Sequence, residues 1–150
     1  MVHLIISVII FNLVAWLIPK RITRDEMLAT SLFALQLEAE ADIYLDLKYR
    51  LYGYFNPGPD WLALVPIYGI FPAITIVFLN YYPFTGKKSE KAIYIAAWSL
   101  FSALYEWSAV YAGWFFYSGW KTWYSALCYL LIFFLLIKFH DLVRWLKRGK

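Results

Sequence analysis

The sequence contains few of the residues on which soluble enzymes and secreted domains depend. Cys128 is the only cysteine, so no disulfide can form within the chain. There is no glycine-rich phosphate loop, no HExxH metal motif and no GxSxG nucleophile motif, and the two histidines, His3 and His140, lack metal-ligand spacing. These absences predict no catalytic residue, no metal site and no cofactor. They argue against an enzyme without excluding one that works through a carboxylate pair alone.

Charge is missing from long segments of the chain, which is 63% hydrophobic and 22% aromatic. Soluble domains contain roughly 45–50% apolar residues, so this composition predicts an integral membrane protein. Basic residues instead form clusters that account for the net charge of +4 without a nucleic acid partner. Basic patches beside membrane spans contact anionic lipid headgroups. The amino terminus lacks the basic region and cleavage site of a secretory signal, so we expect a retained first span.

The apolar segments predict a single all-α domain over residues 1–150, an integral membrane bundle of five transmembrane helices. A spanning helix needs about 20 residues. The expected spans cover residues 2–18, 27–47, 61–82, 92–114 and 120–139, and a basic amphipathic tail over 140–150 is expected to lie along anionic lipid. A capping-box pattern, Thr23 to Glu26, opens the second segment. This segment is the least apolar, and the alternative is four spans plus one interfacial amphipathic helix.

The positive-inside rule separates these two topologies. If residues 27–47 cross the membrane, eleven of the fourteen basic residues fall on one side: Lys20, Arg21, Arg24, Lys87, Lys88, Lys91, Lys138, Arg144, Lys147, Arg148 and Lys150. If that segment lies on the surface, the cluster around Lys88 moves to the opposite side. The charge pattern therefore favours five spans in a bacterial cytoplasmic membrane, with the amino terminus outside and the carboxyl terminus cytoplasmic.

Carboxylates inside the apolar segments are the strongest indication of a functional site, because ionised groups are costly at membrane depth. Glu38, Asp42 and Asp46 step by four along one face of the second segment. A rise of 1.5 Å per residue places Asp42 and Glu106 at similar depth, roughly 21–22 Å from the cytoplasmic side. Asp46 has Arg50 one turn away as a partner. The others have no basic neighbour, so they are expected to be protonated or to bind a cation.

Other polar residues are expected to support this site. A stripe of serines and small residues in the fourth span should face inward, and Asn12 and Asn80 should bridge helices. The loop over residues 49–60 is rich in turn residues, and its aromatic residues suit an interfacial belt. The expected ligand- or cation-binding residues are Glu106, Asp42, Glu38, Tyr68, Trp107 and Ser125.

Several phrases resemble a family of small, uncharacterised multispan membrane proteins of endospore-forming Bacillus- and Clostridium-type bacteria. The phrases are residues 42–55 (DIYLDLKYRLYGYF), 78–83 (FLNYYP), 98–102 (WSLFS) with 105–107 (YEW), and 117–120 (YSGW). The resemblance implies a bacterial cytoplasmic membrane and an all-helical fold. It implies no activity and assigns no site residue.

Three functions fit the sequence. The first is binding of a small ligand, a cation or a proton in an acidic, aromatic cavity open to the outside, as a carrier, permease-like subunit or sensor. The second is a structural or assembly protein whose polar stripes pack against a partner's helices. The third is a lipid-modifying enzyme. The expected partners are the bilayer, a small cation or proton, and a second copy or another membrane protein.

Overall fold

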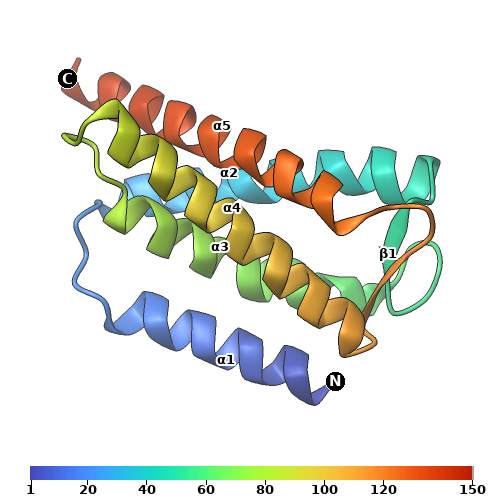
Figure 1. Ribbon diagram of the computed structural model, residues 1–150. Helices are drawn as coiled ribbons and strands as arrows, with labels where there is room; N and C mark the ends of the chain where they lie inside the picture. Colours follow the sequence, from blue (N-terminus) through green and yellow to red (C-terminus); the bar gives the residue numbers. More distant parts are fainter. Residues whose placement is uncertain (150) are drawn as a thin grey trace.

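The chain folds into five α-helices that run alternately in opposite directions (Figure 1). The computed structural model describes residues 1–149. The helices are α1 (Val2–Leu17), α2 (Arg24–Ala41), α3 (Leu64–Tyr81), α4 (Lys88–Tyr111) and α5 (Thr122–Arg148). The shorter elements are the π-helix η1 (Asp42–Lys48), the 3-10 turn η2 (Trp61–Ala63) and the strands β1 (Tyr52–Tyr54) and β2 (Phe115–Tyr117). The predicted all-α, five-helix architecture is confirmed, whereas the sequence did not predict the two strands.

The second helix lies within the bundle, packed against α3 and α5. Together α2 and η1 cover the segment predicted over 27–47, and the predicted capping box from Thr23 to Glu26 is present at its start. Among the described residues, two helical segments are long and apolar enough to cross a membrane, Trp61–Tyr81 and Thr122–Arg148. The first helix is apolar but has only 16 residues. Hydropathy alone therefore supports two spans, fewer than the five that the charge pattern predicts.

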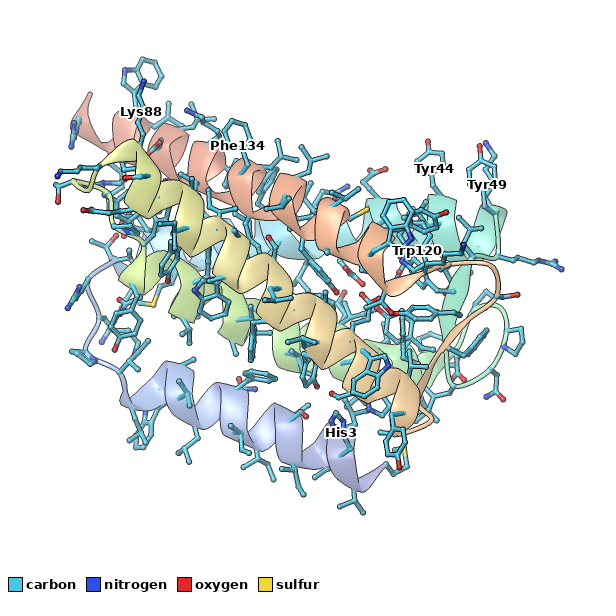
Figure 2. All side chains as sticks on the ribbon, viewed as in Figure 1. His3, Tyr44, Tyr49, Lys88, Trp120 and Phe134 are labelled. Carbon is cyan, nitrogen blue, oxygen red and sulfur yellow. The ribbon has the colours of Figure 1, made fainter. Side chains whose placement is uncertain are left out.

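The bundle exposes apolar side chains and buries polar ones. Ile9 and Leu13 of α1 and Leu131 of α5 are exposed, and Phe134 points away from the bundle (Figure 2). Most of the stripe predicted to face inward from α4 is buried, namely Ser99, Ser102, Ala103 and Ala109, whereas Gly113 just after the helix is exposed. A water-soluble bundle has the opposite distribution, because exposed apolar surface is costly in water.

Two strands close one end of the bundle, which we call the strand end (Figure 1). β1 and β2 pair antiparallel, with Tyr52 opposite Tyr117 and Tyr54 opposite Phe115. Tyr52 and Tyr54 expose only 9% and 6% of their surface, so their predicted place in an exposed aromatic belt is wrong. The strands turn these rings inward, where they pack with Leu4, Ile70 and Trp114 in an apolar cluster.

The opposite end carries the α1–α2 and α3–α4 connections and the carboxyl terminus, and we call it the basic end (Figure 1). Asn80 joins two of these segments, because its Oδ1 accepts the backbone N–H of Arg21 at 2.6 Å and its Nδ2 donates to the Pro19 carbonyl at 3.0 Å. Asn12 of α1 likewise donates to the Gly69 carbonyl of α3 at 2.6 Å. Asn12 bridges two helices, as predicted, whereas Asn80 joins α3 to the connection between α1 and α2. The basic clusters predicted to share one side therefore lie at one end of the bundle.

The carboxyl-terminal segment does not form a separate tail, because α5 continues without interruption to Arg148. Its last turn brings Lys147 to the start of α2. The Lys147 ammonium lies 2.8 Å from Asp25 Oδ2 and 3.3 Å from Glu26 Oε1, and it donates to Thr23 Oγ1 at 2.6 Å. The prediction of a separate tail along the lipid surface is therefore wrong, because Lys147 binds the amino terminus of α2. The carboxylates of Asp25 and Glu26 also interact favourably there with the positive end of the helix dipole.

The contacts of Lys147 predict loss of stability in acid. Hydrogen bonds from Lys147 and Thr23 lower the pKa of Asp25 to about 2. Burial raises the pKa of Glu26, but the Thr23 N–H and the Lys147 ammonium outweigh burial and hold that pKa below 4.5. Both carboxylates therefore take up protons at higher pH in the unfolded chain. Their contribution is complete above about pH 4.5 and is lost as the pH falls through the lower values of the folded protein.

We expect the melting temperature of the purified protein to fall between pH 6 and pH 3, and to fall less steeply in Lys147→Met. Lys138→Met is the matched control, because Lys138 lies over the Phe134 ring and makes no ion pair within residues 1–149. Parallel curves for wild type and Lys147→Met would contradict this interpretation.

Candidate functional site

Glu106, near the strand end of α4, is held by three hydroxyl groups. Its Oε1 accepts from Tyr117 of β2 at 2.5 Å and from Ser125 of α5, and its Oε2 accepts from Tyr129 of α5 at 2.7 Å. Ser125 and Tyr129 are four residues apart and therefore lie on one face of α5. A carboxylate in an apolar bundle needs such donors, since an unpaired buried charge is costly.

The direction of this hydrogen-bond chain is fixed by an indole. Trp120 Nε1 lies 2.7 Å from Ser125 Oγ, and an indole N–H can only donate. Ser125 must therefore accept from Trp120, which leaves its own O–H to donate to Glu106. The chain from Trp120 through Ser125 thus presents a donor to Glu106, and this arrangement suits an ionised carboxylate.

Two further carboxylates are held by the strand β1. The Tyr54 hydroxyl donates to Glu38 Oε1 at 2.6 Å, and the Tyr52 hydroxyl donates to Asp42 Oδ1 at 3.0 Å. Residues four apart on a helix are separated by about 6 Å along its axis, and residues two apart on a strand by about 6.6 Å. The two tyrosines on one face of β1 therefore match the spacing of the two carboxylates.

A cavity of about 130 Å³ lies between α2, α3, α4 and α5, closed at the strand end by both strands. Glu38 reaches it from α2, and Glu106 reaches it from α4 on another side. Most of the remaining lining is apolar or aromatic, including Leu37, Ile70, Tyr105, Trp114, Trp120, Tyr129, Phe133 and Leu136. The cavity thus combines two carboxylates with an apolar and aromatic wall.

No basic side chain compensates these carboxylates. All ion pairs among residues 1–149 involve Asp25 or Glu26, at the basic end. The predicted pair of Asp46 and Arg50 is not formed. The chain leaves η1 at Arg50 with a backbone φ of 52°, a left-handed conformation that ends the regular spacing on which an i,i+4 pair depends. The absence of a protein cation beside Glu38, Asp42 and Glu106 agrees with the sequence prediction.

The structure brings only part of the predicted site together. Glu106, Glu38 and Ser125 line the cavity. Asp42 bonds to Tyr52 but lines a separate groove nearer the strand end, so the partner of Glu106 across the cavity is Glu38. Tyr68 and Trp107 expose 62% and 57% of their surface and do not line the cavity. Tyr68 lies two residues before Ile70 and therefore on nearly the opposite face of α3, and Trp107 is turned by about 100° from Glu106 on α4, which is enough to leave the cavity.

The sequence prediction missed the hydroxyl donors of the site: Tyr52, Tyr54, Tyr117 and Tyr129. Tyr129 had a detectable signal, since it lies one helical turn after Ser125. For Tyr52 and Tyr54 the signal was their alternation around Gly53, which is typical of a strand. Gly53 leaves room there for the Phe116 ring, which a Cβ at this position would approach to 2.7 Å and displace.

A second polar group lies around His3, at the strand end of α1 (Figure 2). Trp114 Nε1 donates to His3 Nδ1 at 3.0 Å, and Ser108 Oγ lies 3.2 Å from His3 Nε2. Because the indole can only donate, Nδ1 accepts and the ring proton is on Nε2. Ser108 in turn donates to the Tyr105 carbonyl at 2.6 Å. His3 therefore cannot take the Ser108 proton in this arrangement, and the pair is structural.

Within residues 1–149 no three His, Cys, Asp or Glu side chains converge closely enough to hold a metal ion. Comparisons with protein-family models, with curated proteins and with solved structures find no match to this chain. The chemistry of the site therefore rests on its geometry: two carboxylates, each held by hydroxyl donors, in an apolar and aromatic cavity.

The hydroxyl of Tyr129 should contribute measurably to stability. Hydrogen bonds to charged groups contribute roughly 1.5–3 kcal/mol, so we expect Tyr129→Phe to lower the free energy of unfolding by about that amount. Tyr111→Phe is the control, because Tyr111 is 88% exposed on the same bundle and should change stability little. Denaturation of the purified protein measures both, and equal effects of the two variants would show that the bond to Glu106 is not stabilising.

Proposed function

We propose that this chain is an integral membrane protein that binds a small organic cation in the cavity between Glu38 and Glu106. One observation carries the proposal: two carboxylates line an apolar, aromatic cavity, and no basic side chain among the described residues neutralises them. A bound cation would supply the missing charge. Carboxylates beside aromatic rings are suited to ammonium groups, because a ring face attracts a cation.

The membrane location is supported by the distribution of side chains. Exposed apolar residues surround helices whose buried faces carry Thr30, Thr75, Ser99 and Ser125. Small and hydroxylated residues at helix contacts and an apolar exterior are typical of membrane bundles. The five-span topology in a bacterial cytoplasmic membrane extends this reasoning to α1, α2 and α4, with the strand end outside and the basic end in the cytoplasm.

The topology predicts the side on which each connection lies. A reporter that is active only in the cytoplasm, inserted after Lys91 at the start of α4, should be active, and one inserted at Gly58 should be inactive. Lys91 lies at the basic end and Gly58 in the connection at the strand end, so the pair tests one crossing of the membrane. Activity at Gly58 but not after Lys91 would reverse the orientation, and equal activity at both would remove α3 as a span.

The cavity favours an organic cation over a metal ion. A metal ion requires several oxygen ligands at short distance, and no such group is found within residues 1–149. Tyr54 holds Glu38, and Tyr129 with Ser125 holds Glu106, so the hydroxyl groups fix each carboxylate separately. Carboxylates beside an apolar wall fit a ligand that has an ammonium group and a hydrocarbon body.

The alternative of an assembly protein receives less support. That function requires the polar stripe of α4 to meet a partner's helices, but Ser99 and Ser102 are buried inside this chain. The surface left for a partner is apolar, as expected for lipid contact. Among the described residues, Ser108 and His3 do not form a nucleophile and base pair, because their hydrogen bonds run in the wrong direction.

Thermal stability of the purified protein with added cations tests the proposal. We expect a subset of organic ammonium ions to raise the melting temperature of the wild type, and Glu106→Gln to abolish the rise. A ligand at one hundred times its dissociation constant stabilises by about 2.7 kcal/mol, which is readily measured. Glu40→Gln is the control, because Glu40 is exposed on α2 and lines no cavity. No response to any ammonium ion, or an unchanged response in Glu106→Gln, would refute it.

A further inference from the structure

A second concave site lies at the strand end, separate from the cavity of Glu38 and Glu106. It is a groove of about 330 Å³ between η1, the connection after β1 and the start of α3. Three aspartates line it, Asp42, Asp46 and Asp60, together with the aromatic residues Tyr54 and Trp61 and the aliphatic residues Leu47, Leu64 and Ile67.

The three aspartates differ in their partners. Asp42 accepts from the Tyr52 hydroxyl, and Asp60 accepts from the Leu62 N–H at 2.9 Å and from Asn56 Nδ2 at 2.8 Å. Asp46 exposes only 7% of its surface, yet within residues 1–149 its carboxylate accepts no hydrogen bond and forms no ion pair. Its oxygens are not fully enclosed, so the carboxylate meets the groove and not the protein interior. A carboxylate that is largely withdrawn from solvent and has no hydrogen-bond donor is unfavourable, and an ammonium ion bound in the groove would supply that donor.

The backbone explains why Asp46 lacks the partner expected from the sequence. It lies in the π-helix η1, and π-helical segments are frequent at functional sites. The left-handed conformation at Arg50 ends the helix before a guanidinium can return to Asp46. On the other side Gly53 of β1 approaches so closely that a Cβ there would lie 3.3 Å from Asp46 Oδ1. The local fold thus excludes a protein cation and leaves the carboxylate facing the groove.

The groove suits a primary ammonium ion with a short hydrocarbon chain. The Asp46 carboxylate can accept from the ammonium, and Asp42 and Asp60 add negative charge nearby. Within the described residues the aspartates do not converge as metal ligands. The aliphatic side chains and the Trp61 ring, which is 87% exposed, offer apolar and aromatic surface to the hydrocarbon part.

We infer that this groove is a second binding site, specific for primary alkylammonium ions, with the Asp46 carboxylate as its anchoring group. The site does not depend on the inner cavity, because Asp46 does not line that cavity and Glu38 and Glu106 do not line the groove. Tyr54 is the only residue with a hydrogen-bonding side chain that borders both, and its hydroxyl is committed to Glu38. The groove and the inner cavity therefore adjoin at Tyr54.

Calorimetric titration of the purified full chain with butylammonium chloride tests the inference. We expect two sites in the wild type, one in Asp46→Asn and one in Glu106→Gln, with at least a tenfold loss of affinity at the altered site. Trp61→Ala should lower the affinity of the groove for butylammonium without disturbing the fold, because the Trp61 side chain is largely exposed. Glu40→Gln should keep both sites.

The outcomes separate this site from the inner one. If Asp46→Asn loses a site and Glu106→Gln keeps both, the groove is supported as a binding site and the inner cavity is refuted. If Glu106→Gln loses a site and Asp46→Asn keeps both, only the groove is refuted. Asp46→Asn should melt no lower than the wild type without ligand, because it removes an uncompensated charge. If Asp46→Asn melts at a lower temperature than the wild type, the Trp61→Ala variant provides the test. A butylammonium affinity in Trp61→Ala equal to that of the wild type would overturn the inference. Binding of magnesium chloride in place of butylammonium also overturns it.

Discussion

The structure depends on the hydrogen bonds that hydroxyl groups donate to carboxylates within an apolar bundle. Among residues 1–149, no cationic side chain pairs with Glu38, Asp42 or Glu106, so hydrogen bonds from hydroxyl groups offset the cost of removing these carboxylates from water. The donors come from β1, β2 and α5, which are distant in sequence. Each carboxylate thereby fixes a connection of the chain to a helix, and the small sheet at the strand end follows from this requirement.

The two ends of the bundle handle charge differently. At the basic end Asp25 and Glu26 meet Lys147, and the ion pairs join α5 to the start of α2. Toward the strand end the carboxylates meet neutral donors or, in the case of Asp46, none. Negative charge without a nearby positive charge among residues 1–149, in concave surfaces lined by aromatic rings, is a physical basis for attracting cations.

The bundle exposes many apolar side chains and buries several polar ones beside its apolar core. Leu131 and Phe134 are exposed while Thr30 and His140 are completely buried. In lipid the apolar exterior costs nothing, and helix association relies on close packing and on polar contacts between helices. The bridge from Asn12 of α1 to the Gly69 carbonyl of α3 is a contact of this kind.

The sequence by itself determined the five helices, the basic end and the inward face of α4, because hydropathy, charge clusters and helical periodicity are local properties. It also identified Glu38, Glu106 and Ser125 as residues of one site, since their depth follows from the rise of a helix. Only the tertiary structure decided which donors hold the carboxylates, that Tyr68 and Trp107 face outward, and that Asp46 lacks Arg50 as a partner. Pairing of β1 with β2 joins residues more than sixty positions apart, so local patterns do not record it.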